Sequence, residues 1–268
     1  MIALLAAYNE RRFIEPCLSH LRANGVDAYL IDNCSTDNTV QLAERWLGRG
    51  LIGMESFPRG EDDRYRWARL LARKEQLSGE LDADWFIHMD PDELRLPPSA
   101  DVSLAEALDE VAGRGFNAVD FMEFTFIPTR EEPDHDHGRF RQTLRTYYPF
   151  RPRSPHRLNA WRAGVDVDLV HSGGHAVRFP GMRPFPEAFP MRHYLFLSID
   201  HAVEKYSERR YDPTEVELGW HGWRARLDSS DLRLPRAAEL RVARTDYDLD
   251  PSEPRTRHHT EEMASAGK

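Results

Sequence analysis

The sequence predicts an α/β fold in which a mostly parallel, Rossmann-like sheet is flanked by helices and followed by a C-terminal helical segment. Two observations lead to this prediction. Continuous apolar runs alternate with segments of helical periodicity over the first third of the chain, and such alternation is typical of parallel strands joined by right-handed crossovers. Of the 268 residues, 40% are hydrophobic and 10% are aromatic, which is enough to build a buried core.

Four apolar runs near the N-terminus are the predicted strands. A run without polar alternation is typical of a strand that is buried on both faces, as in a parallel sheet. These strands are residues 2–7, 28–31, 51–57 and 84–89. Apolar residues at helical spacing predict helices between them, around residues 13–21, 42–47 and 64–77.

The remainder of the chain is less regular. The expected elements are a strand over 118–127, a charged loop over 128–138, strands and irregular loops over 144–195, and helices over 203–211 and 214–227. From residue 247 onward the chain is polar and rich in Pro, Ser and Glu. We therefore expect a single domain over 1–246 and a mobile tail over 247–268.

Charge and cysteine content exclude several classes of protein. Lys and Arg number 36 against 45 Asp and Glu, and the net charge of −9 argues against a nucleic-acid partner. The apolar start, Ile2 to Tyr8, is too short to be a transmembrane segment, and no basic stretch precedes it as in a signal peptide. Cys17 and Cys34 are the only cysteines, which excludes a disulfide scaffold and leads us to expect a cytoplasmic protein.

A cluster of carboxylates follows the strand at 84–89. Asp90 and Asp92 are separated by Pro91, which stiffens the turn, and Glu93 comes next. Two hard oxygen donors in this arrangement suit Mg²⁺ or Mn²⁺, which keeps open positions for phosphate oxygens. The alternative is a strand-to-loop junction in which Asp and Pro only form the turn.

Two further polar segments end the first two strands. Tyr8-Asn9-Glu10 follows the first, and the second runs from Asp32 to Asp37. Asp32 is placed to accept hydrogen bonds from a base or a ribose, whereas Asp37 is alternatively the N-cap of the next helix. No glycine lies in Tyr8-Asn9-Glu10 after the first strand, and the one G-x-G-x-x-G match, residues 48–53, runs into a predicted strand instead of following one. The sequence has no G-x-x-x-x-G-K-[ST]. Both points count against dinucleotide-binding Rossmann enzymes and P-loop NTPases.

These three segments, in this order, resemble the family 2-type glycosyltransferases with the GT-A fold. The resemblance covers residues 1–95 well and 165–225 more loosely, and Asp90-Pro91-Asp92-Glu93 is similar to the family's D-x-D element. It implies a nucleotide-sugar-binding part over 1–95 and an acceptor part over 96–246. It also implies that the donor is bound by Tyr8, Glu10 and Asp32, with Asn9 as an addition, and that its metal side is bound by Asp90 and Asp92.

Histidines late in the chain are further candidates. By the resemblance, His193 completes the metal shell, and the alternative is a histidine hydrogen-bonded in a core. His175 lies in the Gly-rich stretch His171-Ser172-Gly173-Gly174-His175, where a side chain can approach a ligand closely. It is a candidate for substrate contact or for the general base, unless the glycines form only a hairpin turn.

The general base and the diphosphate contact are harder to assign. The chain lacks an obvious Glu-Asp pair after the D-x-D element, so we rank Glu187 first as base, then His175, with Asp166 and Asp168 behind them. Arg66 is our choice for the leaving diphosphate. The alternative for Arg66 and its neighbours at helical spacing is a solvated face balanced by nearby acids.

Two other clusters have simpler explanations. His135 and His137 alternate on an extended segment and resemble half of a zinc site, but no third ligand is evident, so a solvated loop over the acceptor is favoured. The aromatic residues Tyr147, Tyr148, Phe150 and Trp161 are expected in the core rather than in a sugar-stacking surface.

The resemblance thus predicts a metal-dependent glycosyltransferase that uses Mn²⁺ or Mg²⁺. It would move a sugar, with inversion, from a nucleotide-diphosphate donor to a glycan, lipid-linked or small-molecule acceptor. The alternatives are a sugar nucleotidyltransferase, which normally has a Gly-rich basic loop after its first strand, a non-catalytic nucleotide-sugar-binding protein, and a metal-dependent hydrolase built on the histidine-rich segments.

Overall fold

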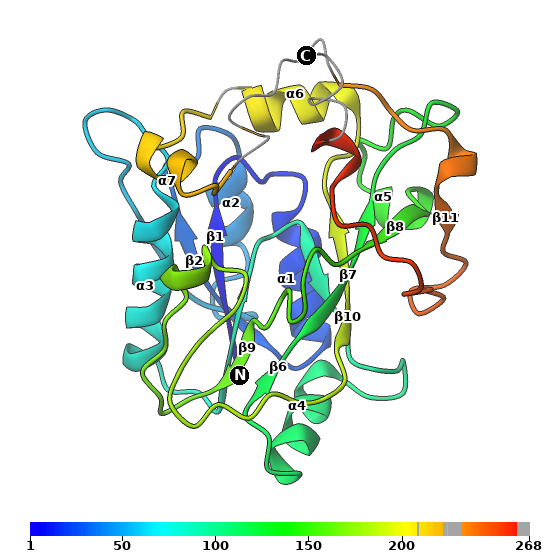
Figure 1. The fold of residues 1–268 in the computed structure, drawn as a ribbon. Coiled ribbons are helices and arrows are strands. Elements are labelled where there is room, and N and C mark those ends of the chain that lie inside the picture. Colours follow the sequence, from blue (N-terminus) through cyan, green and yellow to red (C-terminus); the bar gives the residue numbers. More distant parts are fainter. Residues whose placement is uncertain (208, 222–223, 225–231, 262–268) are drawn as a thin grey trace. The chain divides into compact units, whose positions relative to one another are not determined.

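The computed structural model describes residues 1–207, 209–221, 224 and 232–261 (Figure 1). The chain forms two compact units. Unit 1 comprises residues 1–59, 67–122 and 155–191, and unit 2 comprises 60–66, 123–154 and the described residues from 192 onward. Each unit is assembled from three separate stretches of chain, and the single domain expected over 1–246 stays a prediction.

Unit 1 is built on a six-stranded sheet. Its strand order is β3-β2-β1-β4-β9-β6, with bounds β1 (Ile2–Ala7), β2 (Asp27–Asp32), β3 (Leu51–Ser56), β4 (Trp85–Met89), β6 (Ala118–Val119) and β9 (Ala160–Arg162). The first four strands are parallel, whereas β9 runs antiparallel to both β4 and β6. The predicted α/β fold with a mostly parallel sheet is confirmed.

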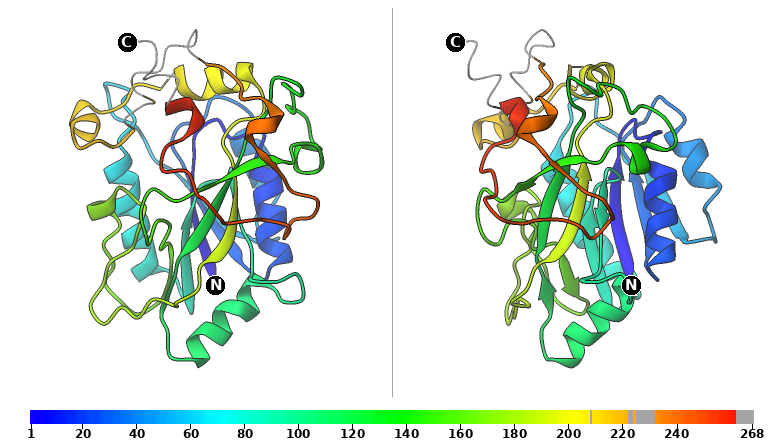
Figure 2. Two further views of the ribbon diagram at one scale, coloured as in Figure 1. Left: turned by 45° about the vertical axis from the view of Figure 1, so that its right-hand side comes forward. Right: turned by 90° about the vertical axis from the view of Figure 1, so that its right-hand side faces the viewer.

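Helices cover both faces of this sheet (Figure 2). The helices α1 (Ile14–Ala23), α2 (Thr39–Glu44) and α4 (Leu104–Gly113) pack in one core with Ala3, Leu5 and Ala7 of β1 and with Ile87 and Met89 of β4. The helix α3 (Trp67–Glu80) lies on the other face, because its Lys74 contacts His88, which points away from Ile87 and Met89. Apolar residues every three or four positions explain why each helix buries one side.

Two helices differ from the prediction. The third was expected over 64–77, but α3 begins and ends three residues later. Helix α4 was not predicted, although its start has a capping box in which Ser103 Oγ accepts from the Glu106 N–H while the Glu106 carboxylate accepts from the Ser103 N–H.

Unit 2 contains most of a second sheet, of order β11-β8-β7-β10-β5. Its strands are β7 (Phe121–Phe126), β8 (Thr146–Phe150), β10 (Phe189–Tyr194) and β11 (Arg241–Val242). The short β5 (Glu93–Arg95) belongs to unit 1, where the Leu96 N–H donates to Pro190 O. The described helices of unit 2 are α5 (Phe140–Thr143), α6 (Ile199–Ser207), α7 (Pro213–Glu217) and the 3₁₀ turn η4 (Ala237–Glu239). Its core includes Tyr148, Phe150, Phe196 and Tyr206.

The C-terminal segment differs from the expected mobile tail in its described part. The Asp250 N–H donates to Tyr147 Oη at 2.8 Å, and Arg255 pairs with the backbone on either side of Phe150. His258 stacks on the Phe150 ring, with ring centroids 3.8 Å apart. These contacts join residues 250–258 to β8, and the mobility of the tail stays a prediction.

The bounds of the two late helices differ from the predicted ones. Helix α6 begins four residues before the predicted start at 203, and α7 covers only the first part of the predicted 214–227 helix. Residues 222–223 and 225–227 of that prediction lie outside the described residues. Among the described residues, none of the helices combines the length and the hydrophobicity that crossing a bilayer requires.

Candidate functional site

The polar segments that follow β1, β2 and β4 lie at one edge of the unit 1 sheet. Ala7 of β1 pairs with Asp32 of β2, and Leu5 of β1 pairs with Met89 of β4. Neighbouring strands are about 4.8 Å apart, so the ends of β2 and β4 are separated by about 10 Å with β1 between them. This spacing leaves room for one ligand to contact both ends.

Asp32 presents a buried acceptor at this edge. The residue is 5% exposed, and its Oδ2 accepts a hydrogen bond from the Ser35 N–H at 3.1 Å. Its Oδ1 is buried and has no hydrogen-bond partner among the described residues. A buried acceptor without a donor is costly, which favours a bound group that supplies an N–H or O–H there.

Tyr8 is covered by an arginine that the sequence analysis did not single out. The guanidinium of Arg59 lies over the Tyr8 ring, 3.4 Å from its centroid. Arg59 Nε donates to Asn33 O at 3.1 Å and to Asn33 Oδ1 at 3.2 Å. Arg59 follows β3 without any motif around it, so only the fold brings its cation to the Tyr8 side of the site.

Asn9 joins two loops of the site. It has a positive φ of 56°, and its Oδ1 accepts from the Thr36 N–H at 2.8 Å, while its own N–H donates to Ser35 Oγ at 2.9 Å. The next residue, Glu10, is buried, and its N–H donates to Thr39 Oγ1 at 2.7 Å. Asn9 therefore holds the β1–α1 loop against the β2–α2 loop, and donor contact by Asn9 or Glu10 stays a prediction.

The acidic turn after β4, which we define as residues 90–93, is closed by Glu93. The Glu93 N–H donates to Asp90 O at 3.1 Å, and Glu93 Oε2 accepts from the Asp90 N–H at 3.3 Å. Arg95 and Arg157 neutralise the Glu93 carboxylate at 2.7 and 3.6 Å. In the motif Asp-Pro-Asp-Glu, the glutamate thus serves to hold the turn.

The other two carboxylates of the acidic turn, those of Asp90 and Asp92, are desolvated by burial. Burial raises the pKa of Asp90. The neighbouring carboxylates of Glu93 and Asp92 raise this pKa further, whereas the ammonium of Lys74 lowers it. No hydrogen bond to the Asp90 carboxylate is found in the described part of the chain. Asp92 is 6% exposed. Such a desolvated acidic pair favours the binding of a cation.

The thiol of Cys17 on α1 gives independent support for this clustering. Burial is the main cause that raises its pKa, and the carboxylates of Asp92, Glu93, Asp90 and Glu10 raise it further. Glu10 follows β1 and the other three follow β4. Charges at the ends of both strands therefore act on the same thiol.

The acidic turn fits a divalent cation that is shared with a ligand. Among the described residues, no group of three or more His, Cys, Asp or Glu side chains is arranged to hold a metal ion. Metal binding by Asp90 and Asp92 stays a prediction. Mg²⁺ and Mn²⁺ need only one or two carboxylates when phosphate oxygens and water supply the remaining ligands, and Asp90 and Asp92 satisfy that requirement.

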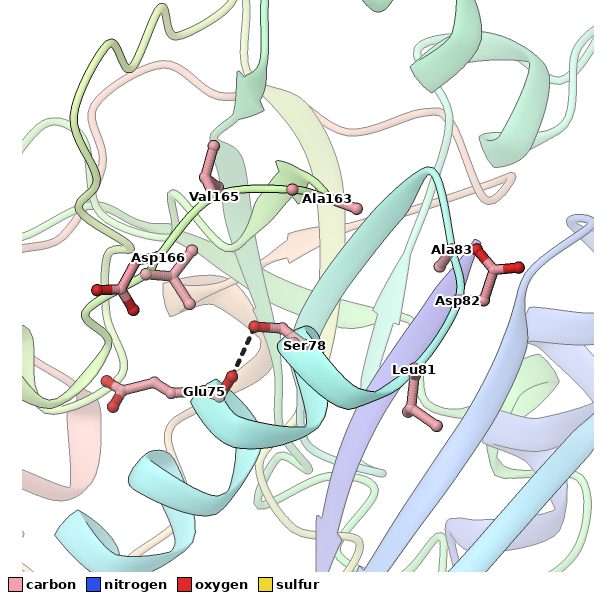
Figure 3. Close-up of a pocket in the computed structure, with 11 residues that line it drawn as sticks. Glu75, Ser78, Leu81, Asp82, Ala83, Ala163, Val165 and Asp166 are labelled. Carbon is pink, nitrogen blue, oxygen red and sulfur yellow. Dashed lines mark hydrogen bonds between the residues drawn. The ribbon is translucent and has the colours of Figure 1, made fainter.

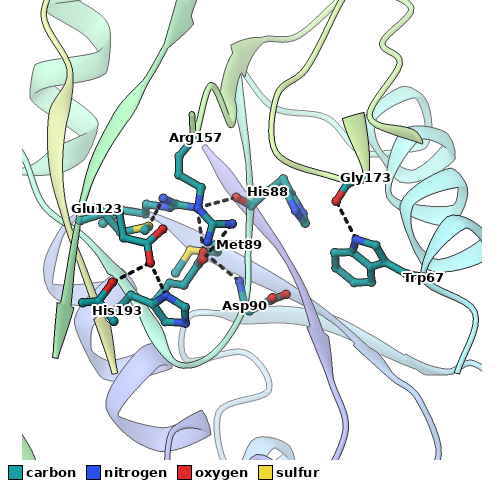
Figure 4. A network of polar contacts seen from close by, with 12 residues as sticks. Trp67, His88, Met89, Asp90, Glu123, Arg157, Gly173 and His193 are labelled. Atoms are coloured by element: carbon teal, nitrogen blue, oxygen red, sulfur yellow. Dashed lines mark hydrogen bonds and ion pairs between the residues drawn. The ribbon is translucent and has the colours of Figure 1, made fainter. Parts of the chain in front are cut away.

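His193 belongs to unit 2 and has a buried partner there. Its Nδ1–H donates to Glu123 Oε1 at 2.7 Å, and Thr125 Oγ1 donates to the same oxygen at 2.9 Å (Figure 4). The Glu123 carboxylate therefore fixes the ring orientation and leaves Nε2 as the other ring nitrogen, the usual arrangement behind a metal-binding histidine. Metal binding by His193 stays a prediction.

His175 is held by the loop that precedes it. Trp67 Nε1 donates to Gly173 O at 2.8 Å (Figure 4), and Gly174, with a φ of +83°, is packed against His88. The half-buried His175 ring stacks on His156, with centroids 5.4 Å apart. The glycine pair thus forms a close contact with α3 and β4 rather than a hairpin turn.

Other predicted site residues lie apart from this cluster or are engaged elsewhere. Glu187 is exposed in the loop before β10, between Phe185 and Phe189, and no described contact joins it to the acidic turn. Arg66 belongs to unit 2, where it pairs with Asp62 and with Asp212. Their roles in catalysis and donor binding stay predictions.

The lower-ranked base candidates and the histidine pair are also placed. Asp168 accepts from Arg178 at 2.6 Å and from the His171 N–H, and Asp166 lines the cavity described next. The rings of His135 and His137 are 6.4 Å apart, and both contact Thr143 Oγ1. In the part of the chain that the structure describes, no third side chain joins this pair to make a zinc site.

A cavity of about 460 Å³ lies in unit 1 (Figure 3). Its lining comes from the second half of α3, the segment before β4 and residues 163–167, and includes the acids Glu75, Asp82 and Asp166. Glu75 Oε1 already accepts from the N–H groups of Leu169 and Val170. The acidic turn does not contribute to this cavity.

Comparison with known proteins points to one family for part of the chain. Residues 3–113 match the family model Glycosyl transferase family 2. This segment runs from β1 to the end of α4 and contains Asp32 and the acidic turn, which confirms the resemblance seen in the sequence. It amounts to less than half of the chain. A comparison with curated proteins found no match.

Solved structures give weaker similarities. The crystal structure of S. aureus TarS is 13% identical, covers 72% of this chain and 36% of that chain, and has a TM-score of 0.43. The structure of TarS 1–349 is 12% identical, covers 72% and 60%, and has a TM-score of 0.39. Glucosyl-3-phosphoglycerate synthase from Mycobacterium tuberculosis in complex with Mn²⁺, UDP and phosphoglyceric acid is 20% identical, covers 46% and 42%, and has a TM-score of 0.31. This chain spans less than two thirds of each, and such low scores carry no argument about function.

Proposed function

We propose that this protein is a glycosyltransferase that transfers a sugar from a nucleotide-diphosphate donor to a hydroxyl acceptor. The family match over residues 3–113 supports the reaction class. The geometry at the carboxyl edge of the unit 1 sheet supports the donor: a buried acceptor after β2 and an acidic turn after β4, separated by the width of about two strand spacings.

The observation that carries this proposal is Asp32 Oδ1. It is a buried carboxylate oxygen without a donor among the described residues, and it belongs to the residue that pairs with Ala7, directly before Tyr8 in the chain. A nucleoside supplies both complements, since its base or ribose carries N–H or O–H donors and its base has a face to pack on a ring. Arg59 would then share the Tyr8 side of the site with the bound base.

Asp90 and Asp92 would hold Mg²⁺ or Mn²⁺ on the diphosphate side of the donor. The cation, when bound, offsets charge that develops on the leaving diphosphate. Glu93 keeps the turn closed, so both aspartates are positioned before the donor arrives. His193 is a further proposed ligand, oriented by Glu123.

A base must remove the proton from the acceptor hydroxyl. We favour His175 over Glu187, because the contacts of Gly173 and Gly174 hold His175 near β4, whereas Glu187 is exposed in a loop. Direct attack by that oxygen on the anomeric carbon would invert its configuration. With both cysteines free, we propose that the reaction takes place in the cytoplasm.

Nucleotide binding tests the donor site. UDP, dTDP and GDP are titrated into the protein by calorimetry with and without Mn²⁺, and the tightest ligand is then titrated into Asp32→Asn. Asparagine keeps the size of the side chain but removes the charge, so we expect binding to weaken about 10- to 100-fold, as for a lost hydrogen bond to a charged group. Asp82→Asn, on an exposed residue outside the site, serves as the control and should bind normally.

Turnover distinguishes an enzyme from a binding protein. Donor hydrolysis is measured with and without Mn²⁺, in the wild type and in Asp92→Asn. We expect a metal-dependent rate that the substitution largely abolishes. Nucleotide binding without any turnover would favour the non-catalytic alternative, and equal binding by Asp32→Asn and the wild type would remove the basis of the proposal.

A further inference from the structure

Lys74 is a fully buried lysine that no step of the proposed reaction uses. It lies on the inner side of α3 with Leu70, Leu71 and Leu77, and its exposed fraction is 0%. Lysine is almost never buried completely unless its charge has a partner. The surroundings of its ammonium group therefore need an explanation.

The ammonium is anchored at the carboxyl end of β4. Nζ donates to His88 Nδ1 at 2.8 Å and to Met89 O at 3.1 Å, and it faces the Trp67 ring at 5.5 Å from the centroid. None of these groups carries a negative charge. Burial and Lys74 itself hold the pKa of His88 well below its usual range, which keeps the ring neutral.

The acidic turn begins with Asp90, directly after Met89, whose carbonyl oxygen accepts from Lys74 Nζ. Arg95 and Arg157 pair with Glu93, and Arg157 also favours the ionised form of Asp90. Among the charges that act on Asp90, that of Lys74 has the largest effect in favour of the ionised carboxylate. In turn, Asp90 and Glu93 are the charges that favour the ammonium form of Lys74. Burial lowers the pKa of Lys74 to about 8, so the group is still mainly charged at pH 7.

We propose that Lys74 is a positioning residue of the metal site: its ammonium is the resident counter-charge of Asp90, which stabilises the acidic turn before a divalent cation binds and weakens the binding of that cation. This inference rests on the proposed function, because it takes Asp90 and Asp92 as the place where the cation binds. It assigns a specific role to a residue with no exposed surface.

A counter-charge and a purely structural lysine at position 74 lead to opposite changes in cation affinity when the lysine is replaced. If Lys74 only anchors β4 to α3, removing it should disorder the turn and weaken cation binding. If it is the counter-charge, removing it should strengthen cation binding, because a positive charge no longer opposes the incoming ion. The stability of the cation-free protein should fall in both cases.

The experiment measures Mn²⁺ affinity by calorimetry at pH 7 in the full chain, without nucleotide. Lys74→Met keeps the length of the side chain and removes the charge, and we expect it to bind Mn²⁺ about tenfold more tightly than the wild type, as Coulomb interaction at an effective dielectric near 20 allows. Lys74→Arg keeps the charge and should bind with wild-type affinity. Arg69→Met removes an exposed cation from the same helix and serves as the matched control.

Thermal unfolding supplies a second readout. Cation-free Lys74→Met should melt below the wild type, and saturating Mn²⁺ should raise its melting temperature by more than it raises that of the wild type. If Lys74→Met does not fold, Lys74→Gln, which retains a donor for Met89 O, takes its place with the same expected tightening.

The outcomes separate the two proposals. Unchanged or weaker Mn²⁺ binding by both neutral variants, with wild-type circular dichroism, overturns the role of Lys74 and leaves the glycosyltransferase proposal standing. A wild type that binds neither Mn²⁺ nor any nucleoside diphosphate overturns both.

Discussion

Gly174 is the residue whose substitution gives the most direct test of how the loop before His175 is held. Its φ is +83°, and a Cβ at this position would lie 2.9 Å from His88 Nε2, 3.0 Å from Leu71 Cδ2 and 3.3 Å from Trp67 Cζ2. His88 cannot move aside easily, because Lys74 holds its other ring nitrogen. Gly174→Ala therefore combines a strained backbone with an overfilled core.

The two costs can be estimated separately. A left-handed backbone costs a residue with a Cβ about 1–2 kcal/mol, and overpacking a buried position costs about 1–3 kcal/mol. The free energy of unfolding should therefore fall by about 2–5 kcal/mol, a large part of the stability of an ordinary domain. Urea denaturation followed by tryptophan fluorescence measures this change.

Gly164→Ala is the matched control for the backbone term. Gly164 has a φ of +82°, and a Cβ added to it would meet no atom within 4 Å, so its substitution should cost only the conformational term. The difference between the two variants isolates the clash with His88, Leu71 and Trp67. If Gly174→Ala is no less stable than Gly164→Ala, the close packing of this loop on β4 is refuted.

Three further predictions concern the acidic turn, Lys74 and the link between the two nucleotide-side loops. Glu93→Gln removes the counter-charge of the fully buried Arg95 and should lower the free energy of unfolding by about 3–5 kcal/mol in urea, whereas Glu106→Gln in the exposed capping box should change it by less than about 1 kcal/mol. The pKa of Lys74 is about 8 in the folded chain against an ordinary 10.5, so between these pH values the unfolded state binds a proton that the folded state does not. The stability of the wild type relative to Lys74→Met should therefore rise by about 3 kcal/mol as the pH increases from 8 to 10.5. A stability difference that does not change with pH in urea melts contradicts this. Asn9→Ala breaks the link between the two nucleotide-side loops and should weaken nucleoside-diphosphate binding about tenfold in calorimetry, while equal affinity would show that the loops keep their places without it.

The parallel strands were predictable because a continuous apolar run fits a strand that is buried on both faces. Residues 2–7 are apolar at every position, and a strand of this kind is stable only when both faces are covered. Polar residues directly after such a strand must then lie at the edge of the sheet. That reasoning placed Asp32 and the acidic turn at one edge, and it needed no knowledge of side-chain packing.

Other features could not be deduced from pattern alone. The spacing of Lys74 from Leu70, Leu71 and Leu77 puts it on the buried side of α3, where a charged side chain is not expected. The helical periodicity favoured burial of the Lys74 side chain, whereas its charge favoured exposure. The neighbouring acidic turn makes burial of this charge possible. Arg59 and Glu123 have no local signal, since each acquires its partner through contacts distant in sequence.

The packing of the C-terminal segment on β8 has a consequence for how this protein tolerates shortening. Strand β11 and Arg255 together occupy the outer side of β8, where they take up main-chain groups between Thr146 and Arg151. A chain cut before Arg241 would leave that row of amides and carbonyls open, flanked by Tyr147, Tyr148 and Phe150. An open strand of this composition recruits other chains, so such a truncation should give a protein that self-associates on concentration.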